Sequence, residues 1–349
     1  MSFLVRAAER GKIPDGLVRL GIRRLYRQRL REQRRLHRDP NHRRRFVESL
    51  SAGPVALAQD EANRQHYEVP AAFWERVLGP RLKYSCCHWP SGVADLAGAE
   101  ESMLELVAKR ARLDDGQRIL DLGCGWGSLT LWIAERFPRA EVVAVSNSAP
   151  QRRFIEARLE ALGSPRIQVV TADVASLEAR PGGGAAFDRV VSIEMFEHMR
   201  NWETLLRRVA SWLAPGGRLF LHVFCHREYA YRFEDQGEAD WMARYFFTGG
   251  LMPSDQLARS FDRDLTVEEQ WRVSGRHYRR TAEAWLENLD RHRDSLMAVL
   301  ARTYGEGDAE LWLQRWRLFF LACAELFGTR RGEEWWVTHG LLRATGQGR

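Results

Sequence analysis

The sequence predicts an α/β protein built on a doubly wound, mostly parallel sheet. Short apolar runs rich in Val, Ile and Leu alternate with segments of helical apolar spacing, and a glycine-rich turn follows the first run. Buried parallel strands show continuous apolar runs, whereas covering helices repeat their apolar residues every 3.6 positions. Ligands of such sheets bind at the carboxyl ends of the strands, so the glycine turn indicates a binding loop.

The elements follow one another regularly from residue 117. The expected strands are 117–123, 141–147, 167–173, 188–194 and 217–224, and the expected helices between them are 128–137, 149–163 and 201–213. Residues 280–327 return to helical spacing, and residues 333–344 are typical of closing strands. Because strand and helix alternate in this order, we expect a Rossmann-like sheet.

We divide the chain into two parts. Residues 1–60 are expected to form a basic helical extension, and residues 61–349 the main domain. Within that domain, a helical and aromatic lid is expected as an insertion at about 226–330, because residues 226–252 are aromatic and polar without a clean period. A lid at this place would lie over the carboxyl ends of the strands.

The basic charge of the chain is concentrated at its start. Residues 1–50 hold 15 Lys and Arg against 5 Asp and Glu, a balance of +10, whereas the whole chain carries +7. Such a run can bind nucleic acid or anionic lipid. We favour a solvated helix face instead, because the run does not offer the aromatic interleaving of a nucleic-acid site. The apolar face that packs on the main domain would hold Leu17, Leu20, Ile22, Leu25 and Leu30.

Cysteine usage and hydropathy indicate a reducing compartment. The five cysteines are an odd number without a CxxC pair, and no stretch approaches the roughly 18 consecutive apolar residues that cross a bilayer. We therefore expect free thiols and a cytoplasmic location. His222, Cys225 and His226 resemble metal ligands, but no second ligand pair accompanies them, so no metal is expected.

The glycine loop carries the strongest local signal. Gly123, Gly125 and Gly127 alternate after Asp121, between an expected strand and an expected helix. Glycines there let the backbone turn sharply and approach a ligand closely. Ser128 lies where a dinucleotide fingerprint would place its third glycine, so a nicotinamide cofactor is disfavoured.

Polar residues end the second and third expected strands. Ser146, Asn147 and Gln151 lie where an acidic side chain often holds ribose hydroxyls, and amides can make the same bonds without charge. Asp173 ends the third strand and can accept from an adenine amino group. The alternative for Asp173 is a helix N-cap. We favour a nucleoside site.

Two carboxylates and an imidazole follow the fourth expected strand. Glu194, Glu197 and His198 lie within five residues at the sheet edge. In a cleft, such groups can hold a cationic amine and accept its proton. Glu194 and His198 are four residues apart, so one helical turn would align them on one face. The alternative is a helix cap with a surface pair, and the place at a strand end favours catalysis.

Seven segments together carry a resemblance to a known family. They are HYEVPAAFWERVLGPRLKYSCCHWP, LDLGCGWG, AVSNS, SIEMFEHM, FCHREYAYRFED, YFFTGGLMPS and AELFGTRRGEEWWVTH. The chain resembles the cyclopropane-fatty-acid-synthase-like methyltransferase superfamily over nearly its whole length, and within it the coclaurine N-methyltransferase group. The resemblance implies a class I methyltransferase sheet, S-adenosylmethionine as cofactor, and Glu194, Glu197 and His198 as catalytic residues. It implies cofactor contacts from Tyr84, Ser85, Asp121, Gly123, Gly125, Asn147, Gln151, Asp173 and Val174.

The lipid-cyclopropanating branch of this superfamily resembles the chain less well. The resemblance implies that this branch needs a bicarbonate site made by a Cys, a Glu, a His and a Tyr. Cys86, Glu197 and His222 match the first three positions, but residues 319–320 are both Phe where the Tyr is expected. The branch also usually has Gly at the position of Glu194. Both departures argue against cyclopropanation.

These observations predict N-methylation of a small cyclic or aromatic amine. An alkylamine with a pKa of about 10 is mostly protonated at neutral pH, so a proton acceptor is useful. We expect Glu194 and Glu197 to orient the ammonium and His198 to accept its proton. The expected aromatic pocket holds Tyr67, Trp74, Tyr231, Trp241, Phe246 and Trp335.

Two alternatives to this function stay open. One is a lipid-modifying methyltransferase whose basic extension touches membrane, and the other is a catalytically silent scaffold or nucleic-acid adaptor. The intact acid and imidazole cluster counts against a scaffold, because a pure binding protein has no need of it. We expect a small-molecule amine as partner and no nucleic acid, favour no membrane contact, and leave a homodimer open.

Overall fold

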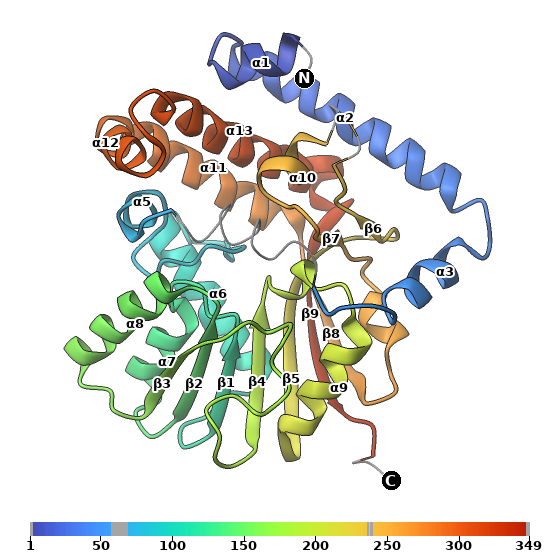
Figure 1. Ribbon diagram of the computed structural model, residues 1–349, viewed down its shortest axis with the longest axis vertical. Coiled ribbons are helices and arrows are strands. Elements are labelled where there is room, and N and C mark those ends of the chain that lie inside the picture. The colour runs from blue at the N-terminus through green and yellow to red at the C-terminus, as the bar shows by residue number, and fades with distance from the viewer. Residues whose placement is uncertain (1–2, 57–68, 236, 238–239, 347–349) are drawn as a thin grey trace.

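The computed structural model describes residues 3–56, 69–235, 237 and 240–346. The domain boundary expected at residue 60 and the expected pocket residue Tyr67 lie outside these residues. Figure 1 shows a sheet covered by helices on both faces, with a further layer of helices above the carboxyl ends of its strands. This arrangement places the ends of the strands between the two halves of the molecule.

The main sheet has seven strands. They are β1 Arg118–Leu122, β2 Glu141–Ser146, β3 Ile167–Thr171, β4 Phe187–Ile193, β5 Leu213–His226, β8 Leu265–Val273 and β9 Trp335–Ala344. Their order is β3-β2-β1-β4-β5-β9-β8, with β1 to β5 parallel and β9 antiparallel to both neighbours. A second, two-stranded sheet pairs β6 Tyr231–Arg232 with β7 Leu251–Met252. The strand order reverses between β1 and β4, which is where doubly wound sheets bind ligands.

Helices cover the sheet and build the upper layer. The α-helices are α1 Phe3–Glu9, α2 Asp15–Leu36, α3 His42–Ser49, α5 Ala71–Val77, α6 Leu96–Ala111, α7 Ser128–Arg136, α8 Ala149–Leu162, α9 Trp202–Trp212, α10 Trp241–Tyr245, α11 Gly275–Arg291, α12 Arg293–Tyr304 and α13 Ala309–Gly328. Short 3-10 helices are η1 Phe196–His198, η2 Leu257–Ser260 and η3 Thr329–Gly332. In Figure 1, α11, α12 and α13 lie side by side above the sheet.

The strands are buried on both faces. In β1, Ile119 packs in the same core cluster as the apolar face of α6, whereas Leu120 packs in the cluster that contains α9. Successive side chains of a strand point to opposite faces, so each strand contributes to both clusters. This two-sided burial explains why the strands are continuous apolar runs in the sequence.

The structure confirms the five expected strands and the three expected helices between them, and it adds strand β8 to the main sheet. Strand β8 has Glu268, Glu269 and Gln270 at its centre, and its pairing with β9 shifts register between Val267 and Glu269. An edge strand with an irregular register lacks the clean alternation that reveals strands in a sequence. The range 226–330, expected to be a lid, therefore includes a strand of the main sheet.

The basic extension packs on the upper layer through only part of the expected apolar face, namely Ile22 and Leu30. Val18, Ile22 and Tyr26 of α2 pack against the main core, whereas Leu17 and Leu20 are 60% and 56% exposed. The expected apolar face was wrong for these leucines because apolar residues are spread among arginines along this helix, and only tertiary contacts decide which side is covered. Leu25 is likewise exposed, while Leu30 is buried.

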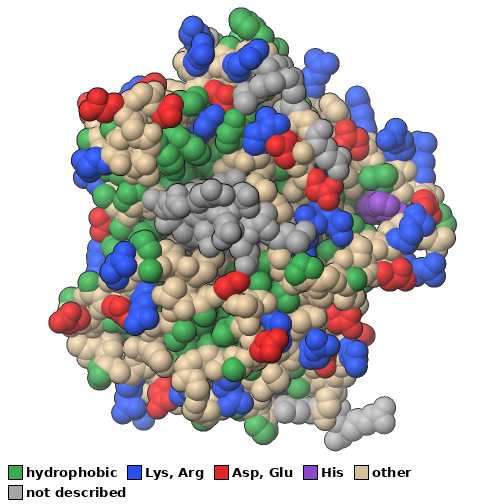
Figure 2. Space-filling model, viewed as in Figure 1, with side chains coloured by type: hydrophobic (Ala, Val, Ile, Leu, Met, Phe, Trp, Pro, Cys, Tyr) green, Lys and Arg blue, Asp and Glu red, His purple; other side chains and the backbone are tan. Residues whose placement is uncertain are grey.

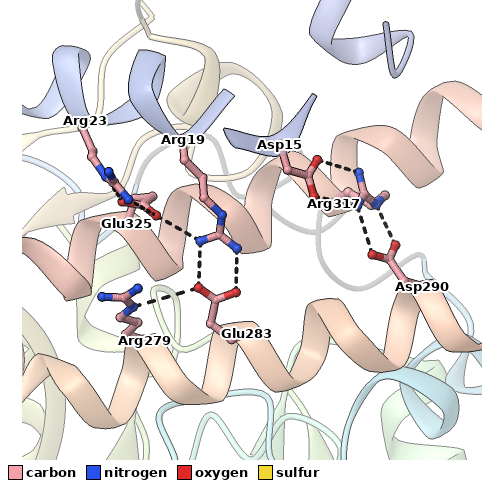
Figure 3. A network of polar contacts seen from close by, with 8 residues as sticks. All are labelled: Asp15, Arg19, Arg23, Arg279, Glu283, Asp290, Arg317 and Glu325. Carbon is pink, nitrogen blue, oxygen red and sulfur yellow. Dashed lines mark hydrogen bonds and ion pairs between the residues drawn. The ribbon is translucent and has the colours of Figure 1, made fainter. Parts of the chain in front are cut away.

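Several arginines of the extension are paired rather than solvated, as Figure 3 shows. Arg19 donates to Glu283 of α11 at 2.7 Å and to Glu325 of α13 at 3.0 Å, and Arg23 also donates to Glu325. Arg317 of α13 bridges Asp15 of α2 and Asp290 of α11. Such a network joins α2 to both helices, so the extension is part of the folded upper layer.

The remaining basic side chains lie on the surface. Figure 2 shows Lys and Arg gathered along the outer edge of the molecule over α2 and α3. Within the described part of the chain, no helix is both long enough and apolar enough to cross a bilayer.

Candidate active site

A cavity opens at the carboxyl ends of the parallel strands. Its walls include all nine residues expected to contact the cofactor, together with Glu194 and His198. Glu197 does not line it. Residues that the sequence did not single out for this cavity complete the walls; they include Lys83, Leu104, Trp126, Phe224, Phe247, Thr248, Tyr278, Trp285 and Phe319.

The glycine loop leaves space for a ligand. Gly125 has a φ of 54°, and a Cβ built on it would meet no described heavy atom within 4 Å. Gly123 has a φ of 90°, and a Cβ there would lie 2.8 Å from Met195. Gly123 is therefore required by packing, whereas Gly125 is open toward the cavity. The backbone amides of Gly123 and Cys124 donate to Val145, which fixes the turn.

Polar residues after β1 and β2 are held in place by their neighbours. Asp121 is buried and accepts from the Thr130 hydroxyl at 2.7 Å, while burial raises its pKa to about 6. Ser146 donates to Gln151 Oε1 at 2.7 Å. The Gln151 amide group is thereby oriented at the start of α8, beside Asn147, and both line the cavity.

Asp173 closes a turn and lies in the wall of the cavity. Its carboxylate accepts from the Ala175 amide at 2.8 Å, so it closes a turn, and it also lines the cavity. No helix follows directly, since the next residues form turns. The helix N-cap alternative is therefore wrong, and the contact with the cofactor stays a prediction.

Glu194 has an unusual backbone and three hydrogen-bond donors. Its φ is 48°, a region that L residues other than glycine rarely adopt. Glu194 Oε1 accepts from the Cys86 amide at 2.9 Å and lies 3.1 Å from His222 Nε2, and Oε2 accepts from the Tyr278 hydroxyl at 2.6 Å. A residue kept in this strained conformation indicates a need for its side chain.

The expected helical alignment of Glu194 with His198 is wrong. Because Glu194 is left-handed, it lies outside the short helix η1 that holds His198. His198 instead stacks on Phe247, with ring centroids 4.8 Å apart and planes 17° apart. Both residues still line the same cavity.

Burial raises the pKa of both carboxylates. For Glu194 the nearby Lys83 ammonium and the Cys86 and Tyr278 donors offset part of this rise. Glu197 is fully buried, and burial together with the charge of Glu194 raises its pKa well above the ordinary value. Its Oε1 accepts from the Phe224 amide at 2.7 Å. Glu197 is thus buried outside the wall of the cavity.

The aromatic walls come from other residues than expected. None of the expected residues Trp74, Tyr231, Trp241, Phe246 and Trp335 lines the cavity, and all but Trp241 are buried in the core. Besides Tyr84, the lining rings are Trp126, Phe224, Phe247, Tyr278, Trp285 and Phe319. An aromatic residue in a sequence does not reveal whether it faces a cavity or a core, because both environments are apolar.

Tyr278 and Lys83 are the functional candidates that the sequence analysis missed. Tyr278 lies on the buried face of α11, where its hydroxyl reaches Glu194. A phenol is therefore present at the site, although Phe319 occupies the position where a Tyr was expected. The Phe residues at 319–320 thus no longer count against cyclopropanation. Lys83 is 1% exposed and donates to Ser85. A lysine inside an apolar segment was the only signal available.

The three residues that resembled metal ligands have separate partners. His222 faces Glu194, Cys225 lies 3.3 Å from the Thr338 hydroxyl, and His226 faces Glu334 at 3.2 Å. Burial lowers the pKa of His226 to about 4 despite Glu334. Alternate strand residues point to opposite faces, so Cys225 is directed away from both histidines.

The fold and the cavity define a class of enzyme. A glycine cradle open at Gly125, amide and carboxylate side chains at the next two strand ends, and a sheet of this order fit S-adenosylmethionine. The protein is an S-adenosylmethionine-dependent methyltransferase of the class I fold. Its sequence matches the mycolic acid cyclopropane synthetase family over residues 57–334, and the chain belongs to this family.

Relatives within the family include N-methyltransferases. An (S)-coclaurine N-methyltransferase of Thalictrum flavum subsp. glaucum is 36% identical over 302 residues, which cover 85% of this chain and 82% of that protein. The crystal structure of a coclaurine N-methyltransferase bound to N-methylheliamine and SAH has a TM-score of 0.91 and 33% identity, covering 97% of this chain and 98% of that chain. A cyclopropane-fatty-acyl-phospholipid synthase of Escherichia coli strain K12 is 29% identical over 277 residues, which cover 78% of this chain and 66% of that protein.

Proposed function

We propose that the protein N-methylates a small cyclic or aromatic amine with S-adenosylmethionine. The amine substrates named for its relatives support this substrate class. The observation that carries the proposal is Glu194, a carboxylate held by three donors in a cavity walled by aromatic rings. A negative group with aromatic faces suits a cationic amine.

The cofactor supplies an electrophilic methyl group, and the residues of the chain position it and the amine. We assign cofactor binding to the nine expected residues, with Gly125 leaving room for it. Methyl transfer is an in-line displacement, so positioning contributes much of the rate. Asn147, Gln151 and Asp173 would orient the nucleoside part through hydrogen bonds.

Glu194 and His198 have separate roles in this proposal. Glu194 attracts the ammonium and orients it, because its carboxylate faces the cavity with three of its lone pairs already engaged. His198 also lines the cavity, and it accepts the proton that the amine must lose before it can act as a nucleophile. Glu197 holds the amide of Phe224 and supports the site from beneath.

The lipid-modifying alternative is less well supported. The Cys86 amide, His222 and Tyr278 would be available to hold a small anion such as bicarbonate if residue 194 were glycine. The Glu194 carboxylate accepts from these same donors. The family's bicarbonate chemistry and the Glu194 side chain therefore compete for one place.

The test compares Glu194→Gln with Glu197→Gln on a panel of cyclic amines, small amines and phospholipid vesicles with labelled cofactor. Glu194→Gln keeps the shape but removes the charge, so we expect kcat/KM for cationic amines to fall at least tenfold more than in Glu197→Gln, which alters a carboxyl group outside the cavity wall. Methylation of acyl chains in vesicles but of no amine would overturn the proposal.

We also propose a cytoplasmic location. All five cysteines are buried and unpaired, as expected in a reducing compartment. Localisation of the tagged protein by fractionation tests this directly.

A further inference from the structure

A line of buried hydrogen bonds runs from Glu194 across the sheet to α6. His222 Nε2 lies 3.1 Å from Glu194 Oε1, and His222 Nδ1 lies 2.9 Å from His339 Nε2. His339 Nδ1 lies 2.8 Å from a guanidinium nitrogen of Arg110. His222 and His339 are directly paired in the β5–β9 register, and both are completely buried. The function proposed above assigns no role to His339 or Arg110.

The direction of the line follows from its last member. A guanidinium carries only donors, so Arg110 donates to Nδ1 of His339. Burial lowers the pKa of both histidines well below the ordinary value, so each is neutral and carries one ring proton. The proton of His339 then lies on Nε2 and points to Nδ1 of His222. His222 in turn carries its proton on Nε2 and donates it to Glu194.

We propose that Arg110 is a positioning residue that keeps Glu194 anionic by fixing the tautomers of His339 and His222. Without Arg110 the direction of all these hydrogen bonds can reverse. Glu194 then takes a proton from solvent, and its O–H donates a hydrogen bond to His222 Nε2. Each histidine then carries its ring proton on Nδ1, and His222 Nδ1 donates to His339 Nε2. Every hydrogen bond between these three residues survives the reversal, but the carboxyl group becomes neutral. With Arg110 in place, reversal would set the Nδ1–H of His339 against a guanidinium N–H, so two donors would face each other.

The surroundings of Arg110 support this role. Its guanidinium is about half-buried and lies 5.2 Å from the Trp271 ring centroid. Among the described residues no carboxylate pairs with it, and His339 is its hydrogen-bond partner. Burying a cation without an ion pair costs free energy. Trp271 lies beside His339 in the β8–β9 register, so ring and imidazole together hold the guanidinium at the end of the line.

Other charged or titratable groups surround the line and stay constant in the test. Those that face Glu194 are Lys83, Cys86, Cys87, Glu197, His222, Tyr278 and Cys323. Those that face His339 are Lys83, His88, Arg110 and His222. Lys83 favours the Glu194 anion from a distance but donates to Ser85, so it cannot set the histidine tautomers.

The inference deepens the proposed function and is tested with three variants of the full chain. Arg110→Met removes the end of the line, Arg110→Lys keeps a charged donor, and Arg152→Met removes an exposed arginine that pairs with Glu156 of its own helix. Nitrogen-15 spectra of the imidazole rings report the tautomers whether or not an amine substrate is known. We expect Nε2 protonation of both histidines in the native protein, Arg110→Lys and Arg152→Met, and Nδ1 protonation in Arg110→Met.

The pH profile gives the second readout. In Arg110→Met the loss of the fixed donor favours protonated Glu194, so the pKa of Glu194 rises. The acid limb of the kcat/KM profile then moves to higher pH by about one pH unit, which is a tenfold loss of kcat/KM at a fixed acidic pH. Arg110→Lys should restore the native limb. Unchanged Nε2 tautomers and an unchanged acid limb in Arg110→Met would overturn the inference. If no amine is methylated but the tautomers switch, the proposed function fails while the inference holds.

Discussion

Gly125 offers the sharpest test of where the cofactor lies, because the chain contains a matched control. Gly125 has a φ of 54° and Gly163, which ends α8, has a φ of 64°, and a Cβ at either meets no described heavy atom within 4 Å. A valine in this left-handed region costs roughly 1 to 2 kcal/mol at each position. Gly163 lies along α8 from Gln151 by about 18 Å, at 1.5 Å per residue.

The two valine variants should therefore unfold at similarly lowered temperatures but differ in binding. Only Gly125→Val places methyl groups in the cavity, so we expect its affinity for S-adenosylhomocysteine to fall at least about 100-fold, or about 3 kcal/mol. Calorimetric titration of both variants at one temperature measures the difference. Equal affinities in the two variants, whether both native or both lost, would refute the placement of the cofactor at Gly125.

The remaining predictions concern the extension and the proton acceptor. Deletion of residues 1–45 should leave affinity for S-adenosylhomocysteine nearly unchanged but lower the melting temperature. The deletion uncovers the face packed by Val18, Ile22 and Tyr26 and breaks the ion pairs of Glu325. An unchanged melting temperature, or loss of all turnover together with vesicle binding, would contradict this prediction. His198→Ala should lower turnover of an amine by about 10² to 10⁴ with little change in cofactor affinity, and higher pH should partly restore it because solvent then deprotonates the amine. A defect of the same size at every pH would show that His198 is structural.

The sequence alone determined the sheet and the place of the site. Strands that are buried on both faces must be apolar throughout, so β1 to β5 are visible as local runs. The ends of such runs mark the edge of a parallel sheet where ligands bind, and this led directly to the glycine loop and to Glu194. These features depend on residues close together in the chain, which is why they could be predicted.

Only the tertiary structure decided which side chains of the site are hydrogen-bonded to one another and which helix faces are buried. Glu194 meets Cys86, His222 and Tyr278 from three distant segments, and no local pattern specifies such a meeting. The same holds for α2, where burial of Val18 rather than Leu17 depends on how α13 lies against it. Contacts between residues far apart in the chain arise from packing of whole elements, so side-chain partners, tautomers and cavity walls appear only once the elements are assembled.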